Sequence, residues 1–145
     1  MPKSKKPTAS QRLETLKAIR MFSDLPVGVL RKIRNVAGEV EVPAGQVLVQ
    51  PNQEGSGMYI VEEGAVVVER RGNKIELGPG ECFGELALLT AHKRTARVRA
   101  KGQTRLLTID RYHFRELLES EPKIAVKLLE MVADRFAHMI EPGTH

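Results

Sequence analysis

The chain has 145 residues, of which 41% are hydrophobic and 28% charged, a size and composition typical of one globular domain rather than a disordered chain. Its single cysteine, Cys82, excludes a disulfide within the chain and favours a cytoplasmic location, and no apolar run approaches the roughly 18–20 residues that span a membrane. Of the net charge of +5, four charges lie in the first twelve residues, at Lys3, Lys5, Lys6 and Arg12, so the nearly neutral remainder argues against direct binding of nucleic acid.

The N-terminal part of the sequence indicates a tail followed by two helices. Residues 1–10 are basic and lack an apolar anchor, so we expect a disordered tail there and a folded domain over residues 11–145. Ser10 is expected to cap the first helix. Pro26 suits the first position of the second helix, because its fixed φ fits a helical start.

From Glu39 the apolar period changes from helical to alternating, which is typical of strands. Short β-branched runs are separated by glycine-rich turn signals such as Glu63-Gly64 and Gly78-Pro79-Gly80. Helical spacing returns at Asp110, a plausible cap, and Pro122 opens a last helix that Pro142-Gly143 should end. The sequence therefore predicts an α+β fold, an eight-stranded antiparallel, jelly-roll-like β-roll flanked by N-terminal and C-terminal helices.

One segment, residues 80–96, interrupts the strand pattern. Glu85 to Leu89 resembles a single helical turn between two strands. Gly84 lets a ligand approach the backbone because it has no Cβ, and the free N–H groups near Leu86 and Ala87 would form an anion site.

Arg94 lies just before the next strand and shares the parity of Ala96 and Val98, which should face inward. A guanidinium directed into a β-roll needs an anion or a well-placed carboxylate. Glu85 could be that carboxylate; with a phosphate at the helical turn, Glu85 would instead be free to accept a ribose hydroxyl. The residues thus point to a site for one phosphate and a sugar.

The run Phe83-Gly84-Glu85-Leu86-Ala87-Leu88-Leu89, followed after four residues by Arg94-Thr95-Ala96, closely resembles the phosphate-binding cassette of cyclic nucleotide-binding domains. The family includes the bacterial catabolite activator, the regulatory subunits of cAMP-dependent protein kinase and cyclic-nucleotide-regulated channels. The resemblance covers about residues 20–140.

This resemblance implies a role for each cassette residue. Arg94 would pair with the phosphate oxygens and Glu85 with the ribose 2′-hydroxyl. The N–H groups near Leu86 and Ala87 would bind the phosphate. The remaining implied contacts are Gly84 beside the sugar, Thr95 on the phosphate or purine edge, Val67, Ile75 and Leu77 as an apolar wall under the base, and Arg135 and Met139 closing over the purine.

Simpler interpretations stay open for several of these residues. Glu85 and Arg94 could form an internal ion pair. The wall residues Val67, Ile75 and Leu77 could be ordinary core, and Arg135 could be a surface residue of the free protein. The four histidines show no paired metal-ligand spacing, which argues against a cupin-like metalloenzyme, the rival β-roll.

The sequence thus predicts a sensor or regulatory module and not an enzyme, with cAMP as its ligand, cGMP as the alternative, and no metal or cofactor. Its partner would be an effector protein of unknown identity, without membrane insertion. A homodimer could form through Leu128, Val132 and Phe136 of the last helix. The alternative is a fragment of a larger transcription regulator, channel or kinase; a regulator of the catabolite-activator type would need a helix-turn-helix beyond His145.

Overall fold

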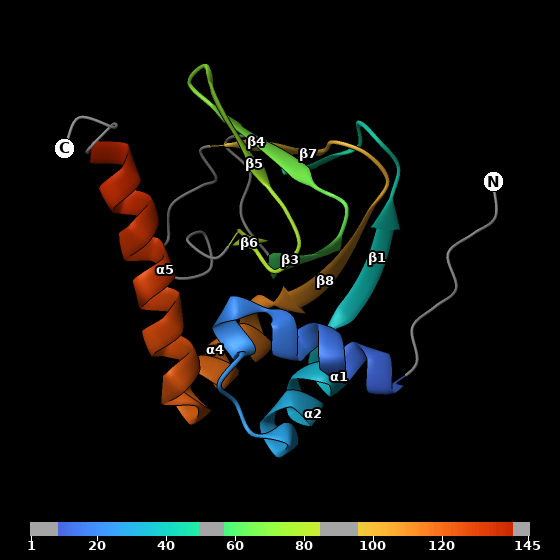
Figure 1. The fold of residues 1–145 in the computed structure, drawn as a ribbon, viewed down its shortest axis with the longest axis vertical. Helices are drawn as coiled ribbons and strands as arrows, with labels where there is room; N and C mark the ends of the chain where they lie inside the picture. The colour runs from blue at the N-terminus through green and yellow to red at the C-terminus, as the bar shows by residue number, and fades with distance from the viewer. Residues whose placement is uncertain (1–8, 50–56, 85–95, 141–145) are drawn as a thin grey trace.

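The computed structural model describes residues 9–49, 57–84 and 96–140. Within this part of the chain, two four-stranded sheets lie on a layer of helices (Figure 1). The helices are α1 (Ala9–Ala18), the short 3-10 helix η1 (Arg20–Phe22), α2 (Val27–Val36), α4 (Arg111–Ser120) and α5 (Pro122–Ile140). The strands are β1 (Gly38–Val42), β2 (Val47–Val49), β3 (Gly57–Glu63), β4 (Val66–Arg70), β5 (Asn73–Leu77), β6 (Cys82–Phe83), β7 (Arg97–Ala100) and β8 (Thr104–Asp110).

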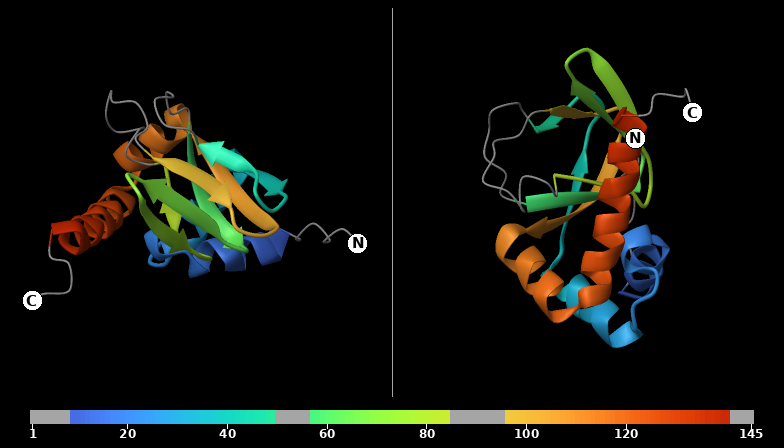
Figure 2. Two further views of the ribbon diagram at one scale, coloured as in Figure 1. Left: turned by 90° about the horizontal axis from the view of Figure 1, so that it is seen from above. Right: turned by 90° about the vertical axis from the view of Figure 1, so that its left-hand side faces the viewer.

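The strands form the predicted antiparallel roll. One sheet has the order β1-β8-β3-β6 and the other the order β2-β7-β4-β5, so each sheet contains strands from both ends of the strand region. Every described strand pairing is antiparallel. The two sheets and the helices beneath them are seen from two further sides in Figure 2. The predicted fold class is confirmed.

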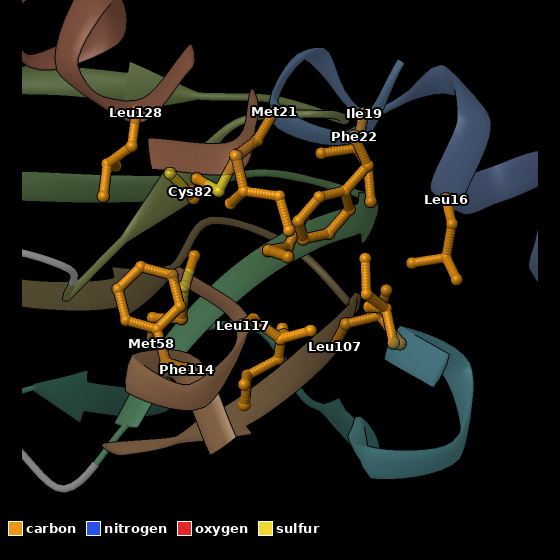
Figure 3. Packing of buried hydrophobic residues seen from close by; sticks show 14 of the residues in the cluster. Leu16, Ile19, Met21, Phe22, Met58, Cys82, Leu107, Phe114, Leu117 and Leu128 are labelled. Carbon is orange, nitrogen blue, oxygen red and sulfur yellow. The ribbon is translucent and has the colours of Figure 1, made fainter. Parts of the chain in front are cut away.

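Alternation along the strands divides the core into two clusters. In β3, Met58 and Ile60 face the helices, whereas Val61 faces the other sheet, and all three are fully buried. The helix-side cluster contains Leu16 of α1, Phe114 of α4 and Leu128 of α5, as Figure 3 shows. The sheet β1-β8-β3-β6 is therefore apolar on both faces, and it joins the helices to the second sheet.

The helix boundaries agree with two of the four predicted start signals. Asp110 caps α4, since its Oδ1 accepts a hydrogen bond of 2.8 Å from the backbone N–H of His113. Pro122 is the first residue of α5, as predicted. Pro26 is the residue before α2 rather than its first residue. Helix α1 begins at Ala9, so Ser10 lies inside it and the last two residues of the predicted tail are helical.

A tight turn joins β4 to β5. Its two central residues, Arg71 and Gly72, have φ values of 49° and 83°, as a two-residue type I′ hairpin turn requires. The turn fixes the register, in which Arg70 is opposite Asn73 and Val68 is opposite Ile75. This register decides which side chains of the hairpin share a face.

Candidate functional site

The residues predicted to bind a ligand lie in three parts of the chain. Gly84 and the predicted wall are described, and helix α5 includes the backbone of Arg135 and Met139. The central residues of the segment fall outside the described residues, and their roles stay predictions: Glu85, Leu86, Ala87, Arg94 and Thr95. The structure therefore shows the two ends of the segment and the surface beside it.

The segment begins at an anchored residue. Phe83 is 4% exposed and belongs to the core between the sheets, and its ring stacks on Tyr59 with 4.9 Å between the ring centroids. The next residue, Gly84, has φ of 91°, a conformation that side chains with a Cβ rarely adopt. The glycine thus turns the chain sharply out of β6 as the segment starts.

The segment ends on strand β7, where the predicted alternation is confirmed. Val98 and Ala100 are buried between the sheets, whereas Arg97 is exposed on the opposite face. Val98 is opposite Val68 of β4, so the inner face of β7 adjoins the inner face of the β4–β5 hairpin.

The predicted apolar wall needs one correction. Ile75 and Leu77 share the inner face with Val68 and Val66, their direct partners across the hairpin. Val67 is opposite Glu76 and therefore lies on the outer face. The reason is the two-residue turn: a turn one residue longer would have put Val67 on the face of Ile75, but this turn puts Val68 there.

The inner wall is open at its tip. Leu77 is 7% exposed and belongs to the core between the sheets, as the ordinary-core interpretation expected. Ile75, nearer the turn, is 58% exposed, and Val68 is only partly buried. Ile75 and Val68 therefore form an apolar platform that the described residues leave accessible, beside the strand into which the cassette leads.

The outer face of the same sheet carries paired charges. Arg99 Nε donates a hydrogen bond of 2.7 Å to Oε1 of Glu69, and Lys101 Nζ pairs with Glu76. The hydrogen bond from Arg99 lowers the pKa of Glu69 below its usual value. These ion pairs join side chains of the outer face across the sheet, which supports a structural role for this face.

Helix α5 is anchored in the core chiefly by its first half, and in its second half Asp134 Oδ2 forms an exposed ion pair of 2.8 Å with Arg20 Nη2 of η1. Ile124, Leu128 and Met131 are buried in the helix-side cluster, and Val132 packs against it. Leu128 is 4% exposed and so cannot contribute to a dimer seam while it stays in the core, which corrects that part of the prediction. Phe136, in the second half, is 59% exposed.

The family comparison matches a part of the chain that includes the segment of residues 80–96. The model for the cyclic nucleotide-binding domain matches residues 39–121, more than half of the chain. A putative potassium channel protein of Rhodopseudomonas palustris is 34% identical over 121 residues, covering 81% of this chain and 29% of the channel protein. A cyclic nucleotide-gated potassium channel of Mesorhizobium japonicum is 38% identical over 108 residues, covering 74% of this chain and 30% of the channel.

Among solved structures, the catabolite activator protein of Thermus thermophilus has a TM-score of 0.75 and 27% identity, covering 83% of this chain and 59% of the activator. The chain thus spans about 30% of the length of the two channel relatives. No helix among the described residues is long and apolar enough to cross a membrane.

Proposed function

The chain belongs to the cyclic nucleotide-binding domain family, whose domains bind a regulatory ligand and are not catalytic; on this premise we propose that it binds cAMP in preference to cGMP and signals through helix α5. The observation that carries the proposal is the accessible platform of Ile75 and Val68, on the inner face of the sheet that the cassette enters. A purine base is a flat apolar surface of the kind that would cover such a platform.

In this proposal the cassette holds the phosphate and sugar. Arg94 pairs with the phosphate oxygens through its planar guanidinium, and Glu85 accepts the ribose 2′-hydroxyl. The N–H groups near Leu86 and Ala87 complete the phosphate site. Arg94 shares its sequence parity with Val98 and Ala100, which are buried, and a guanidinium that continued this inner row would need an anion.

The preference for cAMP rests on two residues. Thr95 is compatible with both bases, since its hydroxyl can meet the guanine amino group, but it also occurs in cAMP-preferring channels that the cassette resembles. Arg135 lies on α5 where those channels place a contact to the purine. We therefore expect cAMP to bind more tightly than cGMP, and a tenfold higher affinity for cGMP would contradict this expectation.

The proposed signal is a movement of the second half of α5. The first half is fixed by buried Ile124, Leu128 and Met131, whereas the described side chains from Ala133 onward are exposed. Asp134 pairs with Arg20 at 2.8 Å, but this ion pair is exposed to water and would hold the second half only weakly. Figure 1 shows this end of α5 extending away from the helical layer. Contacts with a bound purine would favour one position of this half over others, and an effector or a second copy would read that position through exposed Phe136.

The phosphate site is tested by Arg94→Ala, with Arg97→Ala as the matched control. Charge-assisted hydrogen bonds contribute roughly 1.5–3 kcal/mol each, so the loss of two should weaken binding by about a hundredfold or more. Arg97 is exposed on the outer face, and its removal should leave affinity unchanged. Glu85→Ala should cost less than Arg94→Ala. Equal affinity of the parent and Arg94→Ala, with equal melting temperatures, would contradict the site assignment.

The helix signal is tested by hydrogen exchange and truncation. Saturating cAMP should raise protection in residues 83–96 and in residues 133–140. The truncation should follow Asp134 rather than Pro122, because a cut after Pro122 would remove buried Leu128 and Met131 along with the part of α5 that is proposed to move. Unchanged exchange in residues 133–140 together with unchanged affinity of the truncated chain would refute the proposed movement of α5, and nucleotide binding itself would stand.

We also propose that the chain acts in the cytoplasm as the regulatory part of a larger assembly. The alignments cover only 29% and 30% of its two channel relatives, and one of them is named a cyclic nucleotide-gated potassium channel. Cys82 is buried in the helix-side cluster, as a structural thiol in a reducing compartment would be. A homodimer through α5 would have to use exposed side chains such as Leu129 and Phe136, which are 70% and 59% exposed.

A further inference from the structure

A cluster of charged side chains lies where helix α1 meets the sheet β1-β8-β3-β6. Glu39 is opposite Leu107, which belongs to the helix-side core, so Glu39 faces the helices. Arg12 of α1 reaches it, with 3.5 Å between Nη2 and Oε1 of Glu39. The charged groups that face this point from the surrounding elements are Arg12 of α1, Glu39 and Glu41 of β1, Glu62 and Glu63 of β3, and Arg105 of β8.

Two of the four carboxylates are paired with Arg105. Its Nη2 and Nε donate to Oε1 of Glu41 at 2.8 and 3.2 Å, and its Nη1 lies 3.7 Å from Oε1 of Glu63. The Arg105 side chain is 10% exposed, so these contacts are well shielded from water. Arg12 pairs with Glu39, whereas Arg105 and then Arg12 act on Glu62 through their charges.

Glu39 and Glu62 face each other, and the donors of the cluster do not reach all of their oxygens; Arg12 Nε is itself buried without a partner among the described residues. Their carboxyl groups lie within hydrogen-bonding reach of each other. Oε2 of Glu39 and Oε1 of Glu62 are buried and, within residues 9–49, 57–84 and 96–140, accept no hydrogen bond. Ionised carboxylates only accept hydrogen bonds, so two of them cannot satisfy each other, but one proton held between the two carboxyl groups would turn one of them into a donor to the other.

We propose that Glu39 and Glu62 share one proton, and that loss of this proton loosens the start of helix α1 from the β-roll. With the proton in place, the six charged groups carry a net charge of −1; without it, the net charge is −2 and two buried carboxylates repel each other. Helix α1 lies over this point through Arg12, so its withdrawal would let water solvate both carboxylates.

The anchoring of α1 explains why this end would respond. Its C-terminal half is held by Leu16, which is 1% exposed, and is followed by Ile19, also 1% exposed. Toward the N-terminus the described anchors are partly buried Leu13 and the long contact from Arg12 to Glu39. The first turns of α1 can therefore open at the cost of the Leu13 packing while Leu16 and Ile19 stay buried.

Electrostatics supports a switch near neutral pH. Burial, and then the hydrogen bond and charge of Glu39, raise the pKa of Glu62 from 4.5 to about 7, while Arg105 and Arg12 act in the opposite direction. A carboxyl whose pKa is raised in the folded state stabilises that state below its unfolded pKa and loses the effect as the pH rises through the folded value. The docked form of α1 should thus weaken between about pH 5 and pH 7 to 8.

The test is amide hydrogen exchange of α1 in the whole chain at pH 6 and pH 8, corrected for the intrinsic rate. If Glu62 has its ordinary pKa when α1 is open, the opening constant should be about tenfold larger at pH 8. Glu62→Gln, whose amide can donate to Glu39, should make the protection of α1 equal at both pH values. Glu63→Gln is the matched control. Glu63 is the neighbour of Glu62 but its side chain is 67% exposed, so the tenfold change should persist in this variant.

A second measurement follows the Glu62 carboxyl carbon by NMR in the parent chain. We expect a midpoint near pH 7. A midpoint near the ordinary value for glutamate, equal protection of α1 at pH 6 and pH 8 in the parent, or a tenfold change that persists in Glu62→Gln would each overturn the proposal. None of these measurements uses a nucleotide, so failure here is separate from failure of the proposed function.

Discussion

Val68→Ala is expected to weaken cAMP binding, whereas Val67→Ala is expected to leave it unchanged. The two residues are neighbours in β4 and differ in the face they occupy, Val68 opposite Ile75 and Val67 opposite Glu76. Each substitution removes two methyl groups. At about 0.8 kcal/mol per buried methyl or methylene group, a base that covers Val68 fully would lose about 1.6 kcal/mol, so Kd should rise by up to about fifteenfold.

Ile75→Ala should act in the same direction as Val68→Ala. Ile75 is 58% exposed in the absence of ligand, and full burial of an isoleucine contributes about 1.5–3 kcal/mol, so covering its exposed part would contribute about 1–1.7 kcal/mol. The corresponding loss of affinity is about five- to twentyfold. Because the side chain is largely in water, its truncation should change stability little.

Calorimetric titration with cAMP gives Kd for each variant, and thermal unfolding confirms that each is folded. Val67 is 9% exposed, so Val67→Ala should lower the melting temperature without changing Kd. A larger loss of affinity in Val67→Ala than in Val68→Ala would refute the assignment of the inner face as the base-binding face.

Three further predictions concern stability, each measured by urea unfolding. Asp110→Ala removes the cap of α4 and should lower the free energy of unfolding by about 1 kcal/mol; the pKa of Asp110 is held below its usual value chiefly by the backbone hydrogen bond from His113, so the cap should also weaken as the pH falls through that lowered pKa. Leu128→Ala should cost about 2–5 kcal/mol, whereas Leu129→Ala, at a position 70% exposed, should stay within about 0.5 kcal/mol, and equal losses would contradict the described orientation of α5. Gly64→Ala should destabilise strongly, because φ is 87° and a Cβ would lie 2.6 Å from a backbone oxygen, so a loss below about 1 kcal/mol would be unexpected.

The elements that sequence predicted well are those that local chemistry determines. Asp110 and Pro122 sit at helix starts because a carboxylate can accept from a free N–H and because proline lacks one. The alternation that buries Val98 and Ala100 follows from the period of a strand. The cassette resemblance likewise depends on a contiguous run, and the family comparison confirms the family.

The features that sequence missed depend on pairing between distant residues. The length of one turn decides whether Val67 or Val68 faces inward, and a single residue more would have exchanged them. The burial of Leu128 depends on how α5 packs on α4 and η1. Glu39 and Glu62 come from different strands, and only the arrangement of β1, β8 and β3 brings them together. The one available signal was the acidic pair Glu62-Glu63 at the end of an apolar strand.

Titration of the whole chain with cAMP, cGMP and linear AMP in a calorimeter tests nucleotide binding most directly. A phosphate site closed around a cyclic diester should bind cAMP most tightly and cGMP more weakly. Linear AMP should bind at least about tenfold more weakly than cAMP. Its phosphate carries a second charge and is joined to the ribose through one oxygen instead of two, so it is not held in the cyclic geometry. Absence of heat from cAMP and cGMP at millimolar concentration, with the chain folded, or equal binding of cAMP and linear AMP, would contradict the proposed cyclic nucleotide site.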